Sequence, residues 1–232
     1  LKPKPYRADG TQVDELVRKL KDAKMETTIT EEDSKKATAA FGSGTKVATA
    51  SVSDAAGTQQ IEVRKDKEKN YYVKSSAVEG IYKVTADLGD GLDKDLDAYR
   101  NKKVFDFGWN DPTKVEINKK VYTKSGDKWM EGSKPMDSPS IQTLIDKLRD
   151  LAAAKFHDAA PAASPDTAIA VTSNDGKRVE KVAIVKQGAA FIAKRENEPA
   201  GYELDAKAVE ELNKAAAEVK EFQPPKDDKK KK

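Results

Sequence analysis

Cysteine is absent from this sequence of 232 residues, and histidine occurs only once, as His157. The absence of cysteine excludes disulfide bonds, thiolate metal sites, iron–sulfur clusters and cysteine nucleophiles. A single histidine is too few for most zinc sites and for most forms of histidine-based catalysis. No apolar run in the chain reaches the roughly 18 residues that a membrane-spanning helix requires. These absences favour a protein without a reactive constellation of side chains.

Charge is abundant but evenly mixed. Charged residues make up 36% of the chain, well above the ~25% of an average soluble domain. The net charge of +3 resides in residues 226–232, which hold five lysines and two aspartates. We expect this Lys-rich tail to be disordered, either as a solubilising end or as a weak contact for an acidic partner or membrane surface. Because lysines and glutamates are interspersed elsewhere, the sequence does not indicate a nucleic-acid partner.

An internal repeat organises the chain. Residues 9–22 and 137–150 correspond at a constant spacing of 128 positions, and each segment begins with an aspartate suited to N-capping. Apolar residues recur at helical spacing in both segments: Val13, Leu16, Val17 and Leu20 in the first, and Ile141, Leu144, Ile145 and Leu148 in the second. This pattern predicts two helices that each bury one apolar stripe.

Short β-type runs follow each of these helices. They cover residues 47–52, 60–64, 70–74 and 80–84 in the first half, and 168–172, 182–185, 190–194 and 201–204 in the second. Asn174-Asp175-Gly176 predicts a hairpin turn, because these residues tolerate positive φ angles. Each half then closes with a helical pattern, at Leu88, Leu92, Leu96 and Tyr99 and at Val209, Leu212, Ala216 and Val219.

These patterns predict an α+β fold of two tandem repeats, each a helix packed on an antiparallel β-meander with a closing helix. We expect the first repeat at residues 1–112, the second at 113–225 and the tail at 226–232. Strands ending near Trp129 precede the second capped helix, whereas the first capped helix starts already at Asp9. Because sheet edges are normally covered, we expect the opening hairpin of the first repeat, with its own tryptophan, upstream of Leu1. An apolar helix of ~20 residues should precede that hairpin.

Three segments suggest sites, and each also has a plainer interpretation. Residues 87–97 hold five aspartates, but they lack the glycine and terminal glutamate of an EF-hand and fit an acidic helix start. His157 and Asp158 are adjacent and do not orient each other as a catalytic pair; we expect them in an Ala/Pro loop after helix residues 152–154. Residues 41–45 contain two glycines without a following Lys-Ser or Lys-Thr, which favours a helix exit into a strand over a phosphate loop. The sequence therefore predicts no catalytic, cofactor-binding or metal-binding residue.

Aromatic residues gather around the middle of the chain, where Phe105 and Phe107 accompany Trp109, Tyr122 and Trp129. One interpretation is a core seam that joins the two halves. The alternative is a partner-binding surface, because exposed tryptophan and tyrosine side chains often dominate interfaces. Stacking on a sugar ring is a variant of that alternative. The candidate partner-binding residues are therefore Trp109, Trp129 and Tyr122.

Several structural motifs carry a family resemblance. They lie at residues 96–107, 112–117 and 126–129 and at the capped helix from Asp137, and Tyr71-Tyr72-Val73 fits the strand before the closing helix. Together they resemble the bacterial domain-of-unknown-function family 4340 over residues 7–222. The resemblance implies a protein tethered outside the cytoplasmic membrane by one N-terminal helix, in some members beside ABC-type transporter components. It transfers no catalytic residue.

We therefore expect a non-enzymatic, extracytoplasmic interaction or accessory module of a membrane-associated assembly, without a cofactor. Its expected partner is a membrane protein complex with ABC-type transporter components. The expected location is the outer side of the bacterial cytoplasmic membrane, reached through the upstream helix. An envelope protein that binds glycan or peptide is the alternative, and a hydrolase is a more distant one.

Overall fold

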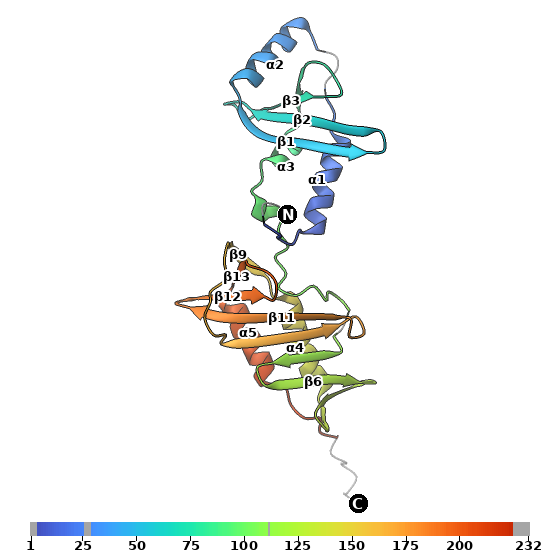
Figure 1. Cartoon of the computed structure of the whole chain (residues 1–232), viewed down its shortest axis with the longest axis vertical. Coiled ribbons are helices and arrows are strands. Elements are labelled where there is room, and N and C mark those ends of the chain that lie inside the picture. The colour runs from blue at the N-terminus through green and yellow to red at the C-terminus, as the bar shows by residue number, and fades with distance from the viewer. Residues whose placement is uncertain (1–3, 26–28, 111, 225–232) are drawn as a thin grey trace, which may run out of the picture. The chain divides into compact units, whose positions relative to one another are not determined.

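The computed structural model describes residues 4–25, 29–110 and 112–224, so the Lys-rich tail at 226–232 lies outside the described residues. The chain divides into two compact units. Of the described residues, those between 7 and 100 form the N-terminal unit, and those from 101 onward together with residues 4–6 form the C-terminal unit. Both units combine helices with antiparallel sheets, which confirms the α+β class (Figure 1). The helices among the described residues are all too short or too polar to cross a bilayer.

The N-terminal unit contains a four-stranded antiparallel sheet in the order β1-β2-β3-β4 among its described residues. Its elements are α1 (Gly10–Asp22), α2 (Glu31–Ser43), β1 (Thr45–Asp54), β2 (Gly57–Lys65), β3 (Tyr71–Ser75), β4 (Ile81–Val84), α3 (Ala86–Leu92) and a 3-10 helix, η1 (Leu96–Tyr99). Asp9 caps α1 as predicted, since its carboxylate accepts a hydrogen bond from the Gln12 N–H at 3.1 Å. All four predicted strands are present.

The closing helix of the first half is broken, contrary to the expectation of one helix from Leu88 to Tyr99. The α-helix ends at Leu92, and the chain turns at Asp93 and Asp95 before η1 begins. Glycines within α3 weaken it, and the extended backbone of Asp95 stops any continuation. Gly89 has a packing role, because a Cβ there would stand 2.1 Å from a ring carbon of Tyr71.

The core of the N-terminal unit is small. Val63, Tyr71 and Val73 form its buried cluster, and Val47, Ile61, Val84 and Leu92 pack around them. The apolar stripe of α1 does not join this core: no residue of α1 is buried, and Val17 is 55% exposed. The prediction that Val17 is buried like Ile145 is therefore wrong. A periodic stripe shows which face of a helix is apolar, not whether the chain covers that face.

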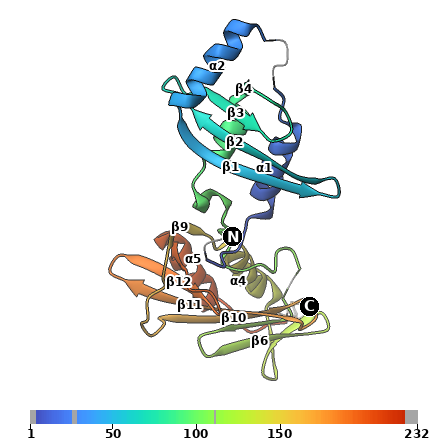
Figure 2. The same cartoon turned by 45° about the horizontal axis from the view of Figure 1, so that its top comes forward.

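The described residues of the C-terminal unit form one nine-stranded sheet in the order β8-β7-β6-β5-β10-β11-β12-β13-β9. The strands are β5 (Lys114–Ile117), β6 (Lys120–Ser125), β7 (Lys128–Glu131), β8 (Lys134–Met136), β9 (Ala153–His157), β10 (Thr167–Ser173), β11 (Arg178–Gln187), β12 (Ala190–Arg195) and β13 (Gly201–Leu204). Helices α4 (Ser138–Asp150) and α5 (Ala206–Ala217) lie side by side on one face of this sheet (Figures 1 and 2). The apolar stripe of α4, which includes Ile141 and Ile145, is fully buried.

Local signals in the second half predict its structure well. Asp137 caps α4 by accepting a hydrogen bond from the Ser140 N–H at 3.0 Å. The turn between β10 and β11 has positive φ at Asn174, Asp175 and Gly176, which confirms the predicted hairpin. Residues 152–154 are not helical, because β9 begins at Ala153 and pairs antiparallel with β13.

The division into units differs from the predicted boundary at residue 112. Val104, Phe105 and Phe107 fill the core of the C-terminal unit, as does Tyr6 from the start of the chain. The two units share an order of elements: each has a capped helix, then four consecutive antiparallel strands, then a closing helix. Isolated bridges at Ala8 and Met136, again 128 positions apart, fit the same scheme. The tandem repeat itself stays a prediction.

Candidate functional site

Trp109 lies at the tip of a tight turn in the C-terminal unit and is 89% exposed. The turn is closed by a 3.1 Å hydrogen bond from the Asn110 N–H to the Phe107 carbonyl oxygen. Gly108 occupies the left-handed region at φ 56°, which a glycine adopts without strain. The preceding Phe107 is buried in the core. The backbone on one side of the turn is therefore anchored while the indole ring projects outward.

Arg149, near the end of α4, holds the backbone of this turn in place. Its Nε donates a 2.7 Å hydrogen bond to the Gly108 carbonyl oxygen, and its guanidinium is paired with Asp146 on the same helix. The guanidinium carbon lies 4.9 Å from the centre of the Trp109 ring and 5.6 Å from that of Phe107. Because Arg149 is itself buried, it places a fixed cation beside the exposed indole ring.

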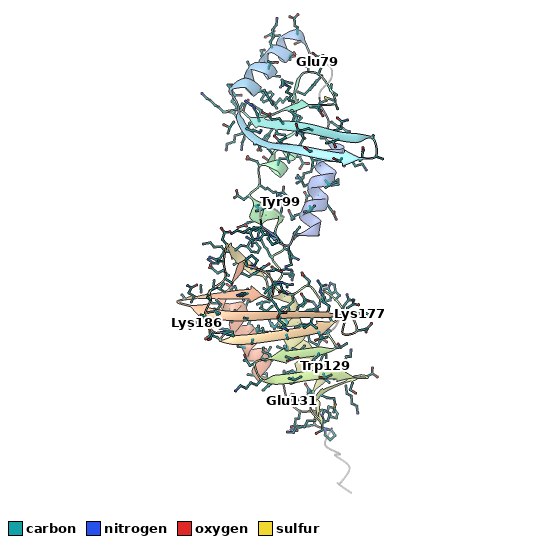
Figure 3. The ribbon with its side chains drawn as sticks, in the orientation of Figure 1. Glu79, Tyr99, Trp129, Glu131, Lys177 and Lys186 are labelled. Carbon is teal, nitrogen blue, oxygen red and sulfur yellow. The ribbon has the colours of Figure 1, made fainter. Side chains whose placement is uncertain are left out.

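The two other candidate partner-binding residues lie in the core. Tyr122 on β6 is completely buried. Trp129, labelled on the sheet of the C-terminal unit in Figure 3, lies on β7 and is 5% exposed. Burial raises the pKa of the Tyr122 hydroxyl to about 12, and the nearby charge of Glu131 adds to this rise. The structure therefore assigns Tyr122 and Trp129 to the core, and only Trp109 offers its ring to a partner. Trp109, in turn, is no part of a buried seam.

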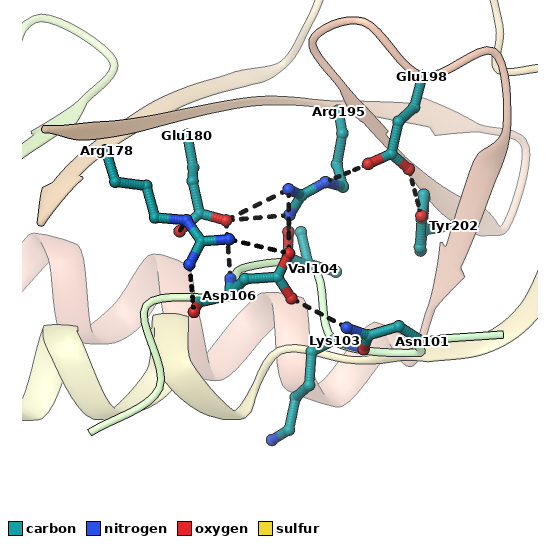
Figure 4. Close-up of polar contacts among 9 residues, drawn as sticks. All are labelled: Asn101, Lys103, Val104, Asp106, Arg178, Glu180, Arg195, Glu198 and Tyr202. Carbon is teal, nitrogen blue, oxygen red and sulfur yellow. Dashed lines mark hydrogen bonds and ion pairs between the residues drawn. The ribbon is translucent and has the colours of Figure 1, made fainter. Parts of the chain in front are cut away.

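A network of charged side chains, which the sequence did not reveal, is centred on Arg195 at the end of β12 (Figure 4). Its guanidinium lies 3.2 Å from the Glu180 carboxylate, 3.4 Å from Asp106 and 2.8 Å from Glu198. Arg178 approaches the same carboxylates, at 3.6 Å from Asp106 and 3.7 Å from Glu180. The side chains of Glu180 and Arg195 are largely withdrawn from solvent.

This network fastens an irregular segment to the sheet. The Glu180 carboxylate accepts a 2.7 Å hydrogen bond from the Asp106 N–H, and Arg195 donates to the Val104 carbonyl oxygen. Two arginines pair with three carboxylates, and the backbone of Val104 and Asp106 contributes further hydrogen bonds. Buried ion pairs of this kind are a recognised means of holding one conformation. We therefore assign the Arg195 network a structural role.

The aspartate-rich segment of α3 is engaged by neighbouring side chains. The Tyr71 hydroxyl donates to Asp90 at 2.7 Å and to Asp93 at 3.2 Å, and Lys65 pairs with Asp93 at 2.6 Å. The Lys65 ammonium lowers the pKa of Asp93. Burial, followed by the hydrogen bond to Asp90, raises the pKa of Tyr71. Within the described ranges, no group of three or more His, Asp or Glu side chains is arranged to hold a metal ion.

His157 and Asp158 have separate partners. Nε2 of His157 lies 2.6 Å from a carboxylate oxygen of Glu203 on the neighbouring strand β13. Asp158 instead accepts a 2.9 Å hydrogen bond from the Tyr6 hydroxyl and pairs with Lys4 at 3.3 Å. Asp158 thus ties residues 4–6 to the C-terminal unit, and the two adjacent residues do not form an acid–base pair.

The glycine-containing segment at residues 41–45 joins α2 to β1, which confirms the predicted helix exit. A Cβ at Gly44 would stand 2.9 Å from the Ala40 carbonyl oxygen, so the glycine permits close backbone packing. The Arg64 guanidinium lies 4.7 Å from the centre of the Phe41 ring and donates to the Phe41 carbonyl oxygen at 3.3 Å. These contacts give the segment a role in packing α2 against β2.

The family model for the domain of unknown function DUF4340 matches residues 2–169 of the chain. Searches of curated proteins and of solved structures gave no significant match.

Proposed function

Because this chain belongs to the DUF4340 family, we propose that it is a non-enzymatic accessory module of a membrane-associated assembly. The proposed location is the outer side of the bacterial cytoplasmic membrane, with a tether upstream of Leu1. The proposed partner is a membrane protein complex that contains ABC-type transporter components. The resemblance to this family supports the proposed location and partner. The composition of the sequence supports a non-enzymatic role, since it lacks cysteine and has one histidine.

The observation that carries an interaction role is the presentation of Trp109. Its ring is 89% exposed, and tryptophan is enriched among the few residues that dominate binding interfaces. The backbone of its turn is held by a hydrogen bond from Arg149, whose guanidinium also lies close to the ring. A rigid aromatic side chain loses little conformational entropy when a partner covers it, which is why tryptophan is enriched at binding hot spots. We assign Trp109 as the anchor of the interface.

Co-purification of the native protein from gently solubilised membranes tests this role. The Trp109→Ala variant should recover a membrane partner at roughly a tenth of the wild-type yield or less, as expected for a hot spot worth ~2 kcal/mol. Val179→Ala is the matched control, because Val179 is also an exposed apolar residue of the C-terminal unit. Recovery of a lone wild-type protein, or equal loss in both variants, would count against the proposal.

A second candidate function is the binding of an envelope glycan or peptide, which the exposed Trp109 ring also favours. Sugar rings and extended peptides stack on open aromatic faces. Tryptophan fluorescence separates this candidate from the first, because Trp109 is exposed and Trp129 is buried. Cell-wall fragments should alter the emission of the wild-type protein and leave that of Trp109→Phe unchanged. An unchanged wild-type emission would exclude this second candidate at accessible concentrations.

A further inference from the structure

Strands β5 to β8 lie together at one end of the nine-stranded sheet, where β6 is labelled in Figure 1. We refer to residues 113–136, which contain these strands and their turns, as the β5–β8 lobe. The lobe has six lysines and three acidic residues, and so carries a net charge of +3. Residues 226–232 carry another +3, which leaves the rest of the chain at −3. Positive charge is therefore concentrated in the lobe and the tail.

Most lysines of the lobe are available to an external anion. Lys119 and Lys120 lie at the turn between β5 and β6, and Lys124 and Lys128 flank the turn between β6 and β7. All four side chains are exposed. The ion pairs that the lobe forms within the described residues involve its two other lysines. The excess charge is thus carried by ammonium groups that no carboxylate of the described chain neutralises.

An apolar row crosses the face of the lobe that is turned away from α4 and α5. Met130 is the register partner of Thr123 on one side and of Pro135 on the other. Phe222 extends the row, because its N–H donates a 2.9 Å hydrogen bond to the Pro135 carbonyl oxygen. Paired residues of an antiparallel sheet share a face, and successive residues alternate between faces. Since Trp129, next to Met130, is buried in the core, the row lies on the outer face.

Apolar and basic groups are combined on this outer face. Phe222 is 52% exposed and Val121 is 37% exposed. Val121 shares the face of the row, because the next residue of β6 is the buried Tyr122. Lys128 also shares it, since it lies two residues before Met130 on β7. Glu116, an acidic side chain of the same face, is already paired with a lysine of β5 at 2.5 Å.

We propose that the outer face of the β5–β8 lobe contacts the surface of an anionic lipid bilayer, in addition to the tether proposed upstream. Lysine side chains near such a surface are attracted to the lipid phosphates. Charge alone would suit any polyanion, but exposed apolar side chains such as Phe222 and Val121 favour the boundary between headgroups and acyl chains. Phenylalanine beside lysine is the composition that segments lying on a membrane use.

The end of the chain adds lysines to the same lobe. Residues 220–222 run beside β8, where the Asp137 N–H donates a 2.9 Å hydrogen bond to the Lys220 carbonyl oxygen and Glu221 pairs with Met136. The Lys-rich tail begins four residues after Phe222, so its lysines are attached where the lobe already presents its own. This inference rests on the membrane location proposed above and does not depend on the role of Trp109.

Sedimentation of the 232-residue chain with protein-free vesicles tests the charged part of the contact. Mixed vesicles of phosphatidylglycerol and phosphatidylcholine should bind the wild type at low salt, and vesicles of phosphatidylcholine alone should not. Lys119→Gln combined with Lys128→Gln should weaken binding by roughly tenfold or more. Lys177→Gln combined with Lys186→Gln is the matched control, because it removes equal charge from exposed lysines at the ends of β11 (Figure 3). The control should bind like the wild type.

Phe222→Ala tests the apolar part and should weaken binding to the mixed vesicles by roughly threefold to tenfold. Phe222→Leu keeps an apolar side chain at this position and should bind nearly as the wild type does. Phe222 and the substituted lysines are exposed, so circular dichroism should show every variant to be folded.

Four results would overturn the proposal. They are absence of binding, equal binding to neutral vesicles, full binding after loss of Lys119 and Lys128, and full binding after Phe222→Ala. The third is expected if the tail alone contacts lipid, and the fourth if the lobe attracts any polyanion. Because the vesicles contain no protein, each of these failures would leave the proposed transporter partner standing.

Discussion

Replacement of Ile145 and of Val17 by aspartate should have very different consequences, although the sequence gives the two positions the same place in a helical stripe. Ile145 is completely buried in α4, whereas Val17 is 55% exposed on α1. The expected cost of Ile145→Asp combines ~2–3 kcal/mol of lost apolar burial with several kcal/mol for a carboxylate placed in an apolar core. A total of ~5 kcal/mol or more approaches the whole stability of many domains.

Val17→Asp should cost only ~1 kcal/mol. Because Val17 is about half exposed, the burial that it loses is at most about half that of a fully buried valine. The helix also loses a few tenths of a kcal/mol in intrinsic propensity. The new carboxylate remains in contact with water, so no charge is buried. The sequence alone predicts equal costs for the two changes, and the difference between them therefore measures what the fold adds.

Urea denaturation followed by two probes provides the assay. Both tryptophans belong to the C-terminal unit, so tryptophan fluorescence follows that unit and should show Ile145→Asp to be largely unfolded without urea. Hydrogen exchange over residues 10–22 and 57–75 follows the N-terminal unit in Val17→Asp and should remain close to that of the wild type. Ile145→Val, expected to cost ~1 kcal/mol, is the conservative control. A Val17→Asp cost as large as that of Ile145→Asp would refute the reasoning.

Three further changes test other parts of the account. Gly89→Ala should destabilise the N-terminal unit by ~2 kcal/mol or more in hydrogen-exchange measurements, because the new Cβ would overlap the Tyr71 ring; an unchanged exchange rate would contradict this packing. Glu180→Ala should lower the stability of the C-terminal unit by ~3–5 kcal/mol, measured by tryptophan fluorescence, since it removes the carboxylate that the largely buried Arg195 shares with the more exposed Arg178; a neutral effect would show the network to be dispensable. Lys65 lowers the pKa of Asp93 below its ordinary 3.8. The pair therefore stabilises the N-terminal unit above about pH 4, and this contribution disappears as the pH falls through the lower pKa of the folded state. Asp93→Asn should reduce the acid sensitivity of thermal unfolding, and a pH profile identical to that of the wild type would contradict the assignment.

Local chemistry made much of the fold predictable. The capping aspartates at Asp9 and Asp137 and the positive-φ turn at Asn174 act over a few residues, and the structure confirms each of them. The four strands predicted after each capped helix are also present, because alternation and turn residues mark them, whereas β9 occupies residues where a helix end and a loop were expected. The broken closing helix was missed, because the periodic leucines continue through Asp95, where the backbone becomes extended.

Properties that depend on distant contacts could not be predicted. Asp106 and Arg195 are 89 positions apart, and no local pattern pairs them among so many charged residues. The exposure of Val17 and of Trp109 depends on what the rest of the chain places over them. Of the aromatic residues proposed for partner binding, the sequence could therefore name the group but could not separate exposed Trp109 from buried Tyr122 and Trp129.

Site-specific photo-crosslinking in intact cells tests the interaction role most directly. A photoreactive phenylalanine analogue at position 109 should yield an adduct with a membrane protein, identified by mass spectrometry as a transporter component. The same analogue at position 179, which is also exposed on the C-terminal unit, should yield little or none. Absence of an adduct from position 109, or equal and unselective adducts from both positions, would contradict the assignment of Trp109 as the anchor.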